Sequence, residues 1–301
     1  MGDFKGLFPA IITPMSADGS FNEAAFREVM EFDIQGGSDG FWVAGGTGES
    51  VLLTEEENNR IAEVAADQAA GRAKNIMHVG AVTTAQAARQ AEHAARSGVD
   101  AICAVPPFFY GGTDESIVEY YRAVGAAADL PLFVYNLPQS TGVDITPDLM
   151  RKIQDGVPQL KGLKHSSPQF ANIRPFADMG LDCFTGMSGL ALPGLMLGAT
   201  GLVDGPPCFA PELWAEVFEA HGAGDTARAV DAQRRATILT NTLLKHGFHA
   251  SLKLAVGIRL GIDCGLPRAP LPRLSAEHED ELRRDLEALG YAREAVAQAG
   301  D

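Results

Sequence analysis

The length, composition and charge of the chain exclude several classes of protein. Its 301 residues, 46% of them hydrophobic, can bury a full core, which excludes disordered and fibrous proteins. The 39 acidic residues against 24 lysines and arginines give a formal net charge of −15, so nucleic acid is not expected as a partner. A pocket can still be locally positive and bind a small anion.

The N-terminal segment and the cysteines indicate the compartment. Residues 1–15 have no basic leader, and prolines interrupt their short apolar run, so we expect neither a signal peptide nor contact with a membrane. The four cysteines have no metal-binding spacing, and a chain of this size does not need disulfides. We therefore expect reduced thiols in a cytoplasmic protein.

Short apolar runs rich in β-branched and aromatic residues alternate with amphipathic segments of helical length. Several runs are apolar throughout, which is typical of parallel strands covered on both faces. Eight βα units are more economically closed into a barrel than left as an open doubly wound sheet with two edges. The predicted fold is therefore α/β, a (β/α)8 TIM barrel. The expected strands are Leu7–Pro14, Gly40–Ala44, Asn75–Ala81, Ala101–Pro106, Pro131–Asn136, Leu160–His165, Leu181–Thr185 and Gly201–Asp204.

Three expected helices begin with capping signals. Asn22 precedes an acidic residue, Thr54 is followed by Glu55–Glu57, and Thr146 is followed by Pro147. These patterns place helices after the first, second and fifth strands, as a βα order requires.

The alternation of strands and helices stops near residue 210. We therefore divide the chain into residues 1–210, with the barrel strands and most helices, and residues 211–301, with the last barrel helix and a C-terminal helical extension of two or three helices. Both parts are expected to form one structural unit. The helical segments expected here are a helix from Pro211 onward, Val230–Leu244, Ser251–Leu260 and Glu277–Leu289.

Lys164 lies in the sixth expected strand, where a buried ammonium group has a high desolvation cost. Alternation puts Lys164 and Gly162 on one face and Lys161 on the other, so one lysine shares the inner face with the barrel mouth. A buried lysine can lose its proton and attack a carbonyl carbon, forming a Schiff base. Alternatively, Lys164 extends out of the barrel end or forms a structural ion pair.

Two further strand ends carry candidate site residues, because the loops at the carboxyl ends of the strands build the site of such a barrel. Gly46, Thr47 and Gly48 follow the second strand, and their N–H groups and hydroxyl suit a carboxylate. Tyr135 lies on the strand before that of Lys164, and a phenol can transfer protons. The alternatives are an ordinary glycine-rich turn and a core tyrosine with a satisfied hydroxyl.

Other polar residues receive structural interpretations. His165 has no second ligand at metal spacing, so no metal is expected in the site. Glu49 is interpreted as a loop salt-bridge residue rather than a catalytic acid, and Cys208 as a packing residue.

Three motifs in order resemble those of the dihydrodipicolinate synthase and N-acetylneuraminate lyase family. They are Gly46–Glu49, Tyr135–Pro138 and Gly162–Ser167, and their spacing agrees with that family along the whole chain. The resemblance implies a (β/α)8 barrel, a homotetramer built as a pair of dimers, and Lys164 as the imine-forming lysine. The imine draws electrons from the neighbouring carbons, so neither a metal nor an organic cofactor is expected.

The same resemblance implies roles for the other site residues. Tyr135 would be the proton-relay phenol, and Gly46 and Thr47 would hold the carboxylate of pyruvate or a longer 2-oxo acid. The expected catalytic residues are Lys164, Tyr135 and Thr47. The expected substrate-binding residues are Gly46, Thr47, Gly48, Ser166, Ser188 and Val203.

Three departures from the family pattern restrict the range of expected substrates. Phe109 stands where synthases place a relay tyrosine, and Tyr110, one residue further on, cannot simply replace it in a regular strand. The segment Gln139–Gly142 lacks the arginine of synthases, which disfavours lysine biosynthesis. The segment Gly186–Gly189 lacks the acidic residues of sialic acid lyases, which disfavours a long polyhydroxylated substrate.

The expected function is that of a Schiff-base lyase or aldolase acting on a 2-oxo acid, with pyruvate as product or donor. The close alternative is a dehydratase or deaminase of a 2-keto-3-deoxy sugar acid or a related hydroxy-oxo acid. A 4-hydroxy-tetrahydrodipicolinate synthase and a non-catalytic sugar-acid binder are further alternatives. Part of the mouth is expected to be apolar, which permits an aromatic or compact substrate; the residues concerned are Trp42, Pro107, Phe108, Phe109 and Met187.

Overall fold

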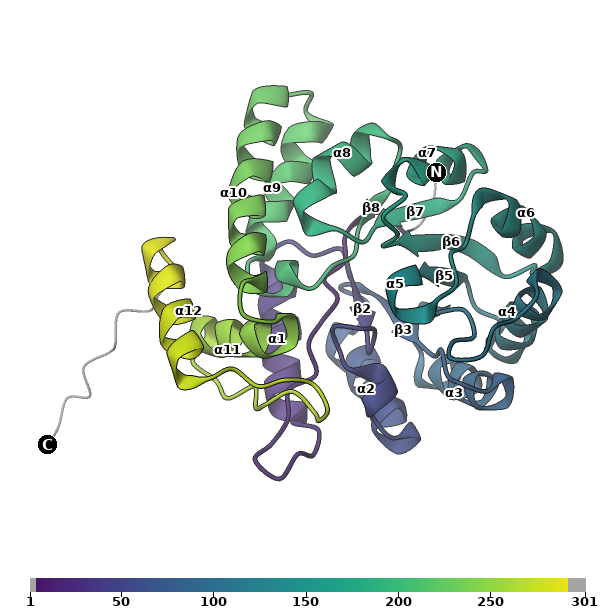
Figure 1. Cartoon of the computed structure of the whole chain (residues 1–301), viewed down its shortest axis with the longest axis horizontal. Coiled ribbons are helices and arrows are strands. Elements are labelled where there is room, and N and C mark those ends of the chain that lie inside the picture. The colour runs from purple at the N-terminus through teal and green to yellow at the C-terminus, as the bar shows by residue number, and fades with distance from the viewer. Residues whose placement is uncertain (1–3, 292–301) are drawn as a thin grey trace, which may run out of the picture.

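A computed structural model describes residues 4–291, and their eight parallel strands form a barrel surrounded by helices (Figure 1). The strands pair in the order β1-β8-β7-β6-β5-β4-β3-β2, and a parallel bridge between Ala10 and Trp42 joins the two ends of this order. The predicted (β/α)8 TIM barrel is thus confirmed. The strands are β1 (Gly6–Leu7), β2 (Gly40–Val43), β3 (Lys74–His78), β4 (Ala101–Ala104), β5 (Leu132–Asn136), β6 (Leu160–His165), β7 (Asp182–Thr185) and β8 (Gly201–Leu202).

The first strand is shorter than the predicted Leu7–Pro14. Regular pairing covers Gly6–Leu7, and beyond it single hydrogen bonds run from Ala10 N to Asp204 O and from Ile11 N to Trp42 O. Pro9 and Pro14 have no N–H to donate, so a continuous ladder cannot form over this segment. The chain leaves the sheet at Thr13, whose hydroxyl donates to Gly48 O at 2.7 Å.

The barrel helices begin where the capping signals predicted. Asn22 accepts a hydrogen bond from Ala25 N, and Thr146 from Leu149 N. Thr54 and Glu57 form a reciprocal capping box. The helices are α1 (Glu23–Gln35), α2 (Glu55–Ala69), α3 (Thr84–Ser97), α4 (Asp114–Ala128), α5 (Pro138–Thr141), α6 (Pro147–Gly156), α7 (Ile173–Asp178), α8 (Ala191–Met196) and α9 (Pro211–Gly222). Short 3-10 turns occupy Ser50–Leu52, Phe170–Asn172, Ser188–Leu190 and Pro206–Cys208.

Beyond α9 the described chain continues as an extension of three helices, α10 (Thr226–Leu244), α11 (Phe248–Leu260) and α12 (Ala276–Ala288). Two begin a few residues before their predicted starts, because Asp225 caps α10 and α11 follows the turn at Gly247. Helix α10 lies beside α9, and the chain then turns back toward α1 (Figure 1). There, the Arg259 guanidinium of α11 lies 5.5 Å from the ring of Phe32 in α1. Within residues 4–291, no helix has the length and apolar character needed to cross a membrane.

Side chains fill the barrel interior, so the strand ends rather than a central pore must carry any site. Phe8, Trp42, Phe133 and Phe184 belong to one inner cluster and are at most 1% exposed. The rings of Phe8 and Phe184 are 4.9 Å apart. A second cluster packs the outer face of the sheet against the helices.

Candidate active site

Lys164 points from β6 into the barrel, as strand alternation predicted. Its side chain is 3% exposed, and Nζ lies 4.3 Å from the ring centre of Tyr135 and 5.5 Å from that of Trp42. In the described chain its side chain makes these two ring contacts, and no carboxylate lies within salt-bridge distance of Nζ. Lys164 therefore neither extends into solvent nor serves a structural ion pair in this part of the chain. A buried, unpaired amine is costly and suits covalent chemistry.

Tyr135 is the register partner of Lys164 on the adjacent strand β5. Its ring packs edge-on against Trp42, at 5.6 Å between ring centres, and against His78, at 6.3 Å. Burial and the charge of Lys164 lower the pKa of His78 to about 4, so this imidazole stays neutral and does not compete with the amine for anions. The phenol is thus held between rigid aromatic groups beside the amine.

The loop after β2 brings Gly46 next to the Tyr135 hydroxyl. A side chain at Gly46 would place its Cβ 3.5 Å from that oxygen, so the glycine leaves space beside the phenol. Thr47 follows and is buried. Gly48 is required for a different reason, because a Cβ there would lie 2.9 Å from Ala44 Cα. The structure thus brings Gly46 and Tyr135 together and gives Gly48 a packing role.

The backbone of this loop is strained at both ends. Ala44 has φ 48° and Glu49 has φ 63°, in the left-handed region that residues with a side chain rarely adopt. Such strain persists only where surrounding contacts impose it.

Residues of the C-terminal extension contact this loop at Gly46 and at its second strained end, Glu49. His249 Nε2 donates to Gly46 O at 2.9 Å. Glu49 forms a fully buried ion pair with Lys253 of α11 at 2.6 Å, and its other carboxylate oxygen accepts from Arg268 N at 2.7 Å. Burial lowers the pKa of Lys253, and the close contact with the Glu49 carboxylate opposes this effect. The interpretation of Glu49 as a structural salt-bridge residue is confirmed.

The contacts of His249, Lys253 and Arg268 with this loop were not predicted from the sequence. One signal was available for Lys253, because it stands in the apolar run Ala250–Val256 of a helix, where a lysine is as unusual as Lys164 is in its strand. Nothing in the sequence indicates the carbonyl that His249 contacts.

The remaining predicted binding residues differ in whether their side chains are free to contact a substrate. Val203 lies in the same inner cluster as Trp42 and Tyr135. Ser166 is buried, with its hydroxyl 3.5 Å from Gly186 O. Ser188 is already engaged, since its hydroxyl and its backbone N–H both donate to Asp204, at 2.6 and 2.8 Å.

His165 faces away from the barrel interior and has a structural environment. Its Nδ1 accepts from Asn136 Nδ2 at 3.2 Å, and its Nε2 donates to Gln169 O at 3.0 Å. Burial lowers the pKa of His165, so the ring stays neutral, and it packs on Phe176 of α7.

The apolar part of the mouth differs from the expectation. Phe108 and Leu137 pack against the inner cluster, and Trp42 is fully buried inside it. Phe109 and Tyr110 instead lie in the loop before α4, 84% and 74% exposed, with their rings 4.9 Å apart. Phe109, whose backbone is in the left-handed region with φ 76°, is thus not packed against the inner cluster as Phe108 is.

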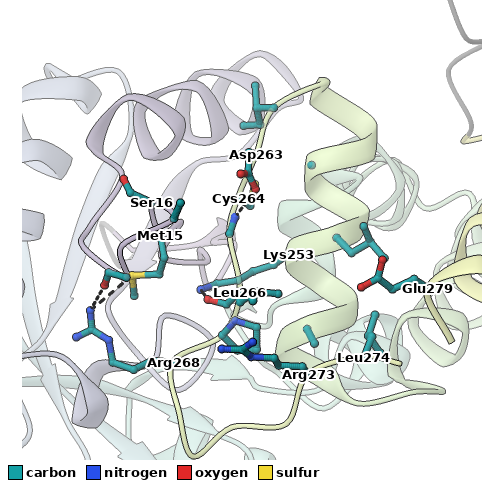
Figure 2. Close-up of a pocket in the computed structure, with 18 of the residues that line it drawn as sticks. Met15, Ser16, Lys253, Asp263, Cys264, Leu266, Arg268, Arg273, Leu274 and Glu279 are labelled. Carbon is teal, nitrogen blue, oxygen red and sulfur yellow. Dashed lines mark hydrogen bonds between the residues drawn. The ribbon is translucent and has the colours of Figure 1, made fainter. Parts of the chain in front are cut away.

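A separate cavity of about 760 Å3 lies between the loop after β1 and helices α11 and α12 (Figure 2). Met15 and Lys253 line it from opposite sides, and Arg268 reaches it from the connection before α12. It borders the ion pair behind Glu49, whereas Lys164 and Tyr135 are not part of its wall.

Comparison with known proteins identifies the class to which this (β/α)8 barrel with its buried lysine belongs. Residues 3–289 match the dihydrodipicolinate synthetase family, and the chain belongs to that family. It is accordingly a lyase of this family.

Two relatives and one solved structure show what the chain is similar to. The chain is 32% identical to an N-acetylneuraminate lyase of Rhizobium meliloti, over 97% of this chain and 94% of that protein. It is 31% identical to a 4-hydroxy-tetrahydrodipicolinate synthase of Methanothrix thermoacetophila, over 93% and 95%. A catalytic-lysine mutant of the sialic acid aldolase of Ruminococcus gnavus superposes with a TM-score of 0.91 at 26% identity, over 95% of this chain and 96% of that one.

Proposed function

We propose that this lyase works through a Schiff base between Lys164 Nζ and the C2 carbonyl of a 2-oxo acid, with pyruvate as product or donor. The observation that carries the proposal is the buried Nζ, 4.3 Å from the Tyr135 ring and without a carboxylate partner in residues 4–291. The sialic acid aldolase of Ruminococcus gnavus is described as having a catalytic lysine, which supports the same role for a lysine in this fold.

The proposed reaction balances without a metal or an organic cofactor. The neutral amine attacks C2, the carbonyl oxygen leaves as water, and an iminium forms. The C4 hydroxyl then loses its proton, the C3–C4 bond breaks, and its electron pair moves into the iminium to give an enamine and an aldehyde. Protonation of C3 and hydrolysis of the imine release pyruvate and Lys164. Condensation is the same sequence reversed.

Tyr135 is the proposed proton carrier, and the loop after β2 is the proposed carboxylate site. The Tyr135 hydroxyl faces Gly46 and has no hydrogen-bond partner among the described residues. The backbone N–H groups around Gly46 and Thr47, with the Thr47 hydroxyl, would hold the substrate carboxylate beside it. The same contacts would set C2 within reach of Nζ. Ser166 and Val203 would complete the wall, and Ser188 would act through its contact with Asp204.

A compact 2-oxo acid is the proposed substrate class. The segment Gln139–Gly142 offers no arginine for a second carboxylate, and Gly186–Gly189 offers no carboxylate for sugar hydroxyls. Phe108 and Leu137 add apolar surface near the inner cluster. A dehydratase or deaminase of a 2-keto-3-deoxy sugar acid passes through the same enamine, and product analysis separates it: an aldolase releases pyruvate and an aldehyde, whereas a dehydratase product keeps every carbon.

A homotetramer is the proposed assembly. Four apolar side chains that are more than half exposed, Val51, Val82, Phe109 and Tyr110, lie in the consecutive loops after β2, β3 and β4. Large apolar side chains that are exposed on neighbouring loops are consistent with a protein–protein interface at this end of the barrel. Native mass spectrometry tests the assembly, and Phe109→Asp should dissociate it.

Borohydride trapping tests the imine. Protein incubated with pyruvate and sodium borohydride should gain the mass of one reduced adduct, and peptide analysis should place it on Lys164. Lys161→Gln is the matched control, since Lys161 lies on the same strand, 3.5 Å from Asp182, and should leave the adduct unchanged. An unmodified Lys164 after incubation with a series of 2-oxo acids would leave the non-catalytic binder as the better interpretation.

A further inference from the structure

A cluster of potential metal ligands lies in the C-terminal extension, at the turn after α10 and the facing side of α12. The ligand atoms of His246, Glu281 and Asp285 all lie within 4.8 Å of one another. His246 Nε2 is 3.2 Å from Glu281 Oε2. Two ligands at about 2.05 Å from one tetrahedral zinc ion stand about 3.3 Å apart, so this spacing suits a single ion.

The imidazole of His246 gives an independent indication of a ligand. Its side chain is 8% exposed, and Nε2 makes no hydrogen bond within residues 4–291. The nearby Glu281 oxygen does not have hydrogen-bond geometry toward it. The ring stacks on His278 at 4.4 Å and 19°, which fixes its plane. A buried imidazole nitrogen that lies 3.2 Å from a carboxylate oxygen and still makes no hydrogen bond is an unfavourable arrangement, which a cation bound by both groups would relieve.

Lys245 shows that the two carboxylates already hold one cation. Its Nζ donates to Glu281 and, at 3.0 Å, to Asp285. Lys245 makes no hydrogen bond to His246 in the described chain. Its side chain is 45% exposed and borders a shallow hollow of about 450 Å3, together with Asp285. The ammonium therefore has room to swing away, and water has room to complete a coordination shell.

We propose that His246, Glu281 and Asp285 bind a divalent transition-metal ion in exchange with the Lys245 ammonium. One imidazole nitrogen and two carboxylate oxygens suit a borderline ion such as Zn2+ better than Mg2+ or Ca2+, which prefer oxygen ligands. The two carboxylates neutralise the ion. The site is distinct from the proposed imine chemistry.

The ion would join α12 to the turn that leads into α11. His249, three residues after His246, holds the Gly46 carbonyl. Metal binding would therefore stabilise the part of the extension that supports the loop after β2.

Isothermal titration of the chelator-treated, full-length protein with ZnCl2 tests the site. We expect binding of one ion per chain and a rise in melting temperature. His246→Gln and Glu281→Gln should each weaken binding about tenfold or more. Lys245→Met should tighten binding, because it removes the competing ammonium. Glu287→Gln, on the same helix outside the cluster, should change nothing.

Several results would overturn the site. They are the absence of saturable Zn2+ binding, a His246→Gln protein that binds as tightly as the wild type, or a Lys245→Met protein that binds no better. Circular dichroism of each metal-free variant shows whether it is folded, and the Lys245→Met arm predicts a gain that misfolding cannot produce.

Discussion

Tyr135 and Lys164 are register partners on adjacent strands, and the lysine nitrogen lies 4.3 Å from the centre of the tyrosine ring. The ring face gives a buried ammonium partial compensation of about 1–2 kcal/mol, far less than its desolvation costs. Burial of Lys164 therefore lowers the stability of the fold, at the residue that the proposed imine chemistry requires.

Lys164→Met should abolish turnover and stabilise the fold. Turnover should fall about a thousandfold or more, because no other residue can form the imine. The free energy of unfolding should rise by about 1–3 kcal/mol, because an unpaired buried amine becomes a thioether of similar length. Urea denaturation measures the second effect. A variant less stable than the wild type would argue against an uncompensated amine.

Tyr135→Phe should lower kcat by about 10²–10⁴-fold, the usual contribution of a general acid or base, with a small change in KM. The ring that packs on Trp42 and His78 remains, so the melting temperature should stay nearly constant. Steady-state kinetics of pyruvate formation, after a substrate is found, gives both constants. An unchanged kcat would mean that protons move by another route.

Lys253→Met should destabilise the protein by about 3–5 kcal/mol, because it leaves Glu49 buried without its partner. The double variant Glu49→Gln with Lys253→Met should recover most of this loss, since it removes both charges. Thermal unfolding of the wild type, the single variants Glu49→Gln and Lys253→Met, and the double variant completes the cycle. If the double variant is as unstable as the single one, packing rather than charge holds this contact.

His249→Ala should raise KM for the 2-oxo acid with little effect on kcat or on melting temperature. His249 is only half-buried, and its hydrogen bond positions the Gly46 carbonyl rather than filling a core. His221→Ala, an exposed histidine at the end of α9, is the control and should behave as the wild type. A fall in kcat alone would indicate that His249 does not act on substrate binding.

Asp33→Asn should remove a decrease in the free energy of unfolding that the wild type shows as pH rises. Asp33 is fully buried without a hydrogen bond to its carboxyl oxygens in residues 4–291, and burial, aided by the charge of Glu212, raises its pKa well above the usual range. The folded protein therefore keeps a proton that the unfolded chain releases above about pH 4. Stability should fall by up to about 1.4 kcal/mol per pH unit as pH rises from 4 toward the folded-state pKa.

Denaturation of wild type and Asp33→Asn between pH 5 and 8 checks this sign. The difference in stability between the two proteins should grow in favour of the variant as pH rises. A constant difference over this range would mean that Asp33 is ionised in the folded state.

The sequence predicted most of the barrel because strand and helix periods are local properties. Alternation alone placed Lys164 on the inner face of β6, opposite in direction to Lys161. Capping residues such as Thr54 and Thr146 fixed helix starts for the same reason, since their partners lie three residues away. The predicted length of the first strand was wrong because the apolar residues of this segment indicate a strand, whereas its prolines interrupt the hydrogen-bond ladder.

Contacts between distant segments could not be predicted in this way. The sequence by itself determined the barrel, its family and the direction of Lys164, because each depends on short-range periodicity or on motifs in register. Only the tertiary structure decided that Lys253 pairs with Glu49, that His249 reaches Gly46, and that Phe109 is exposed. These contacts join residues about 200 positions apart or depend on one backbone angle, and no local pattern specifies either.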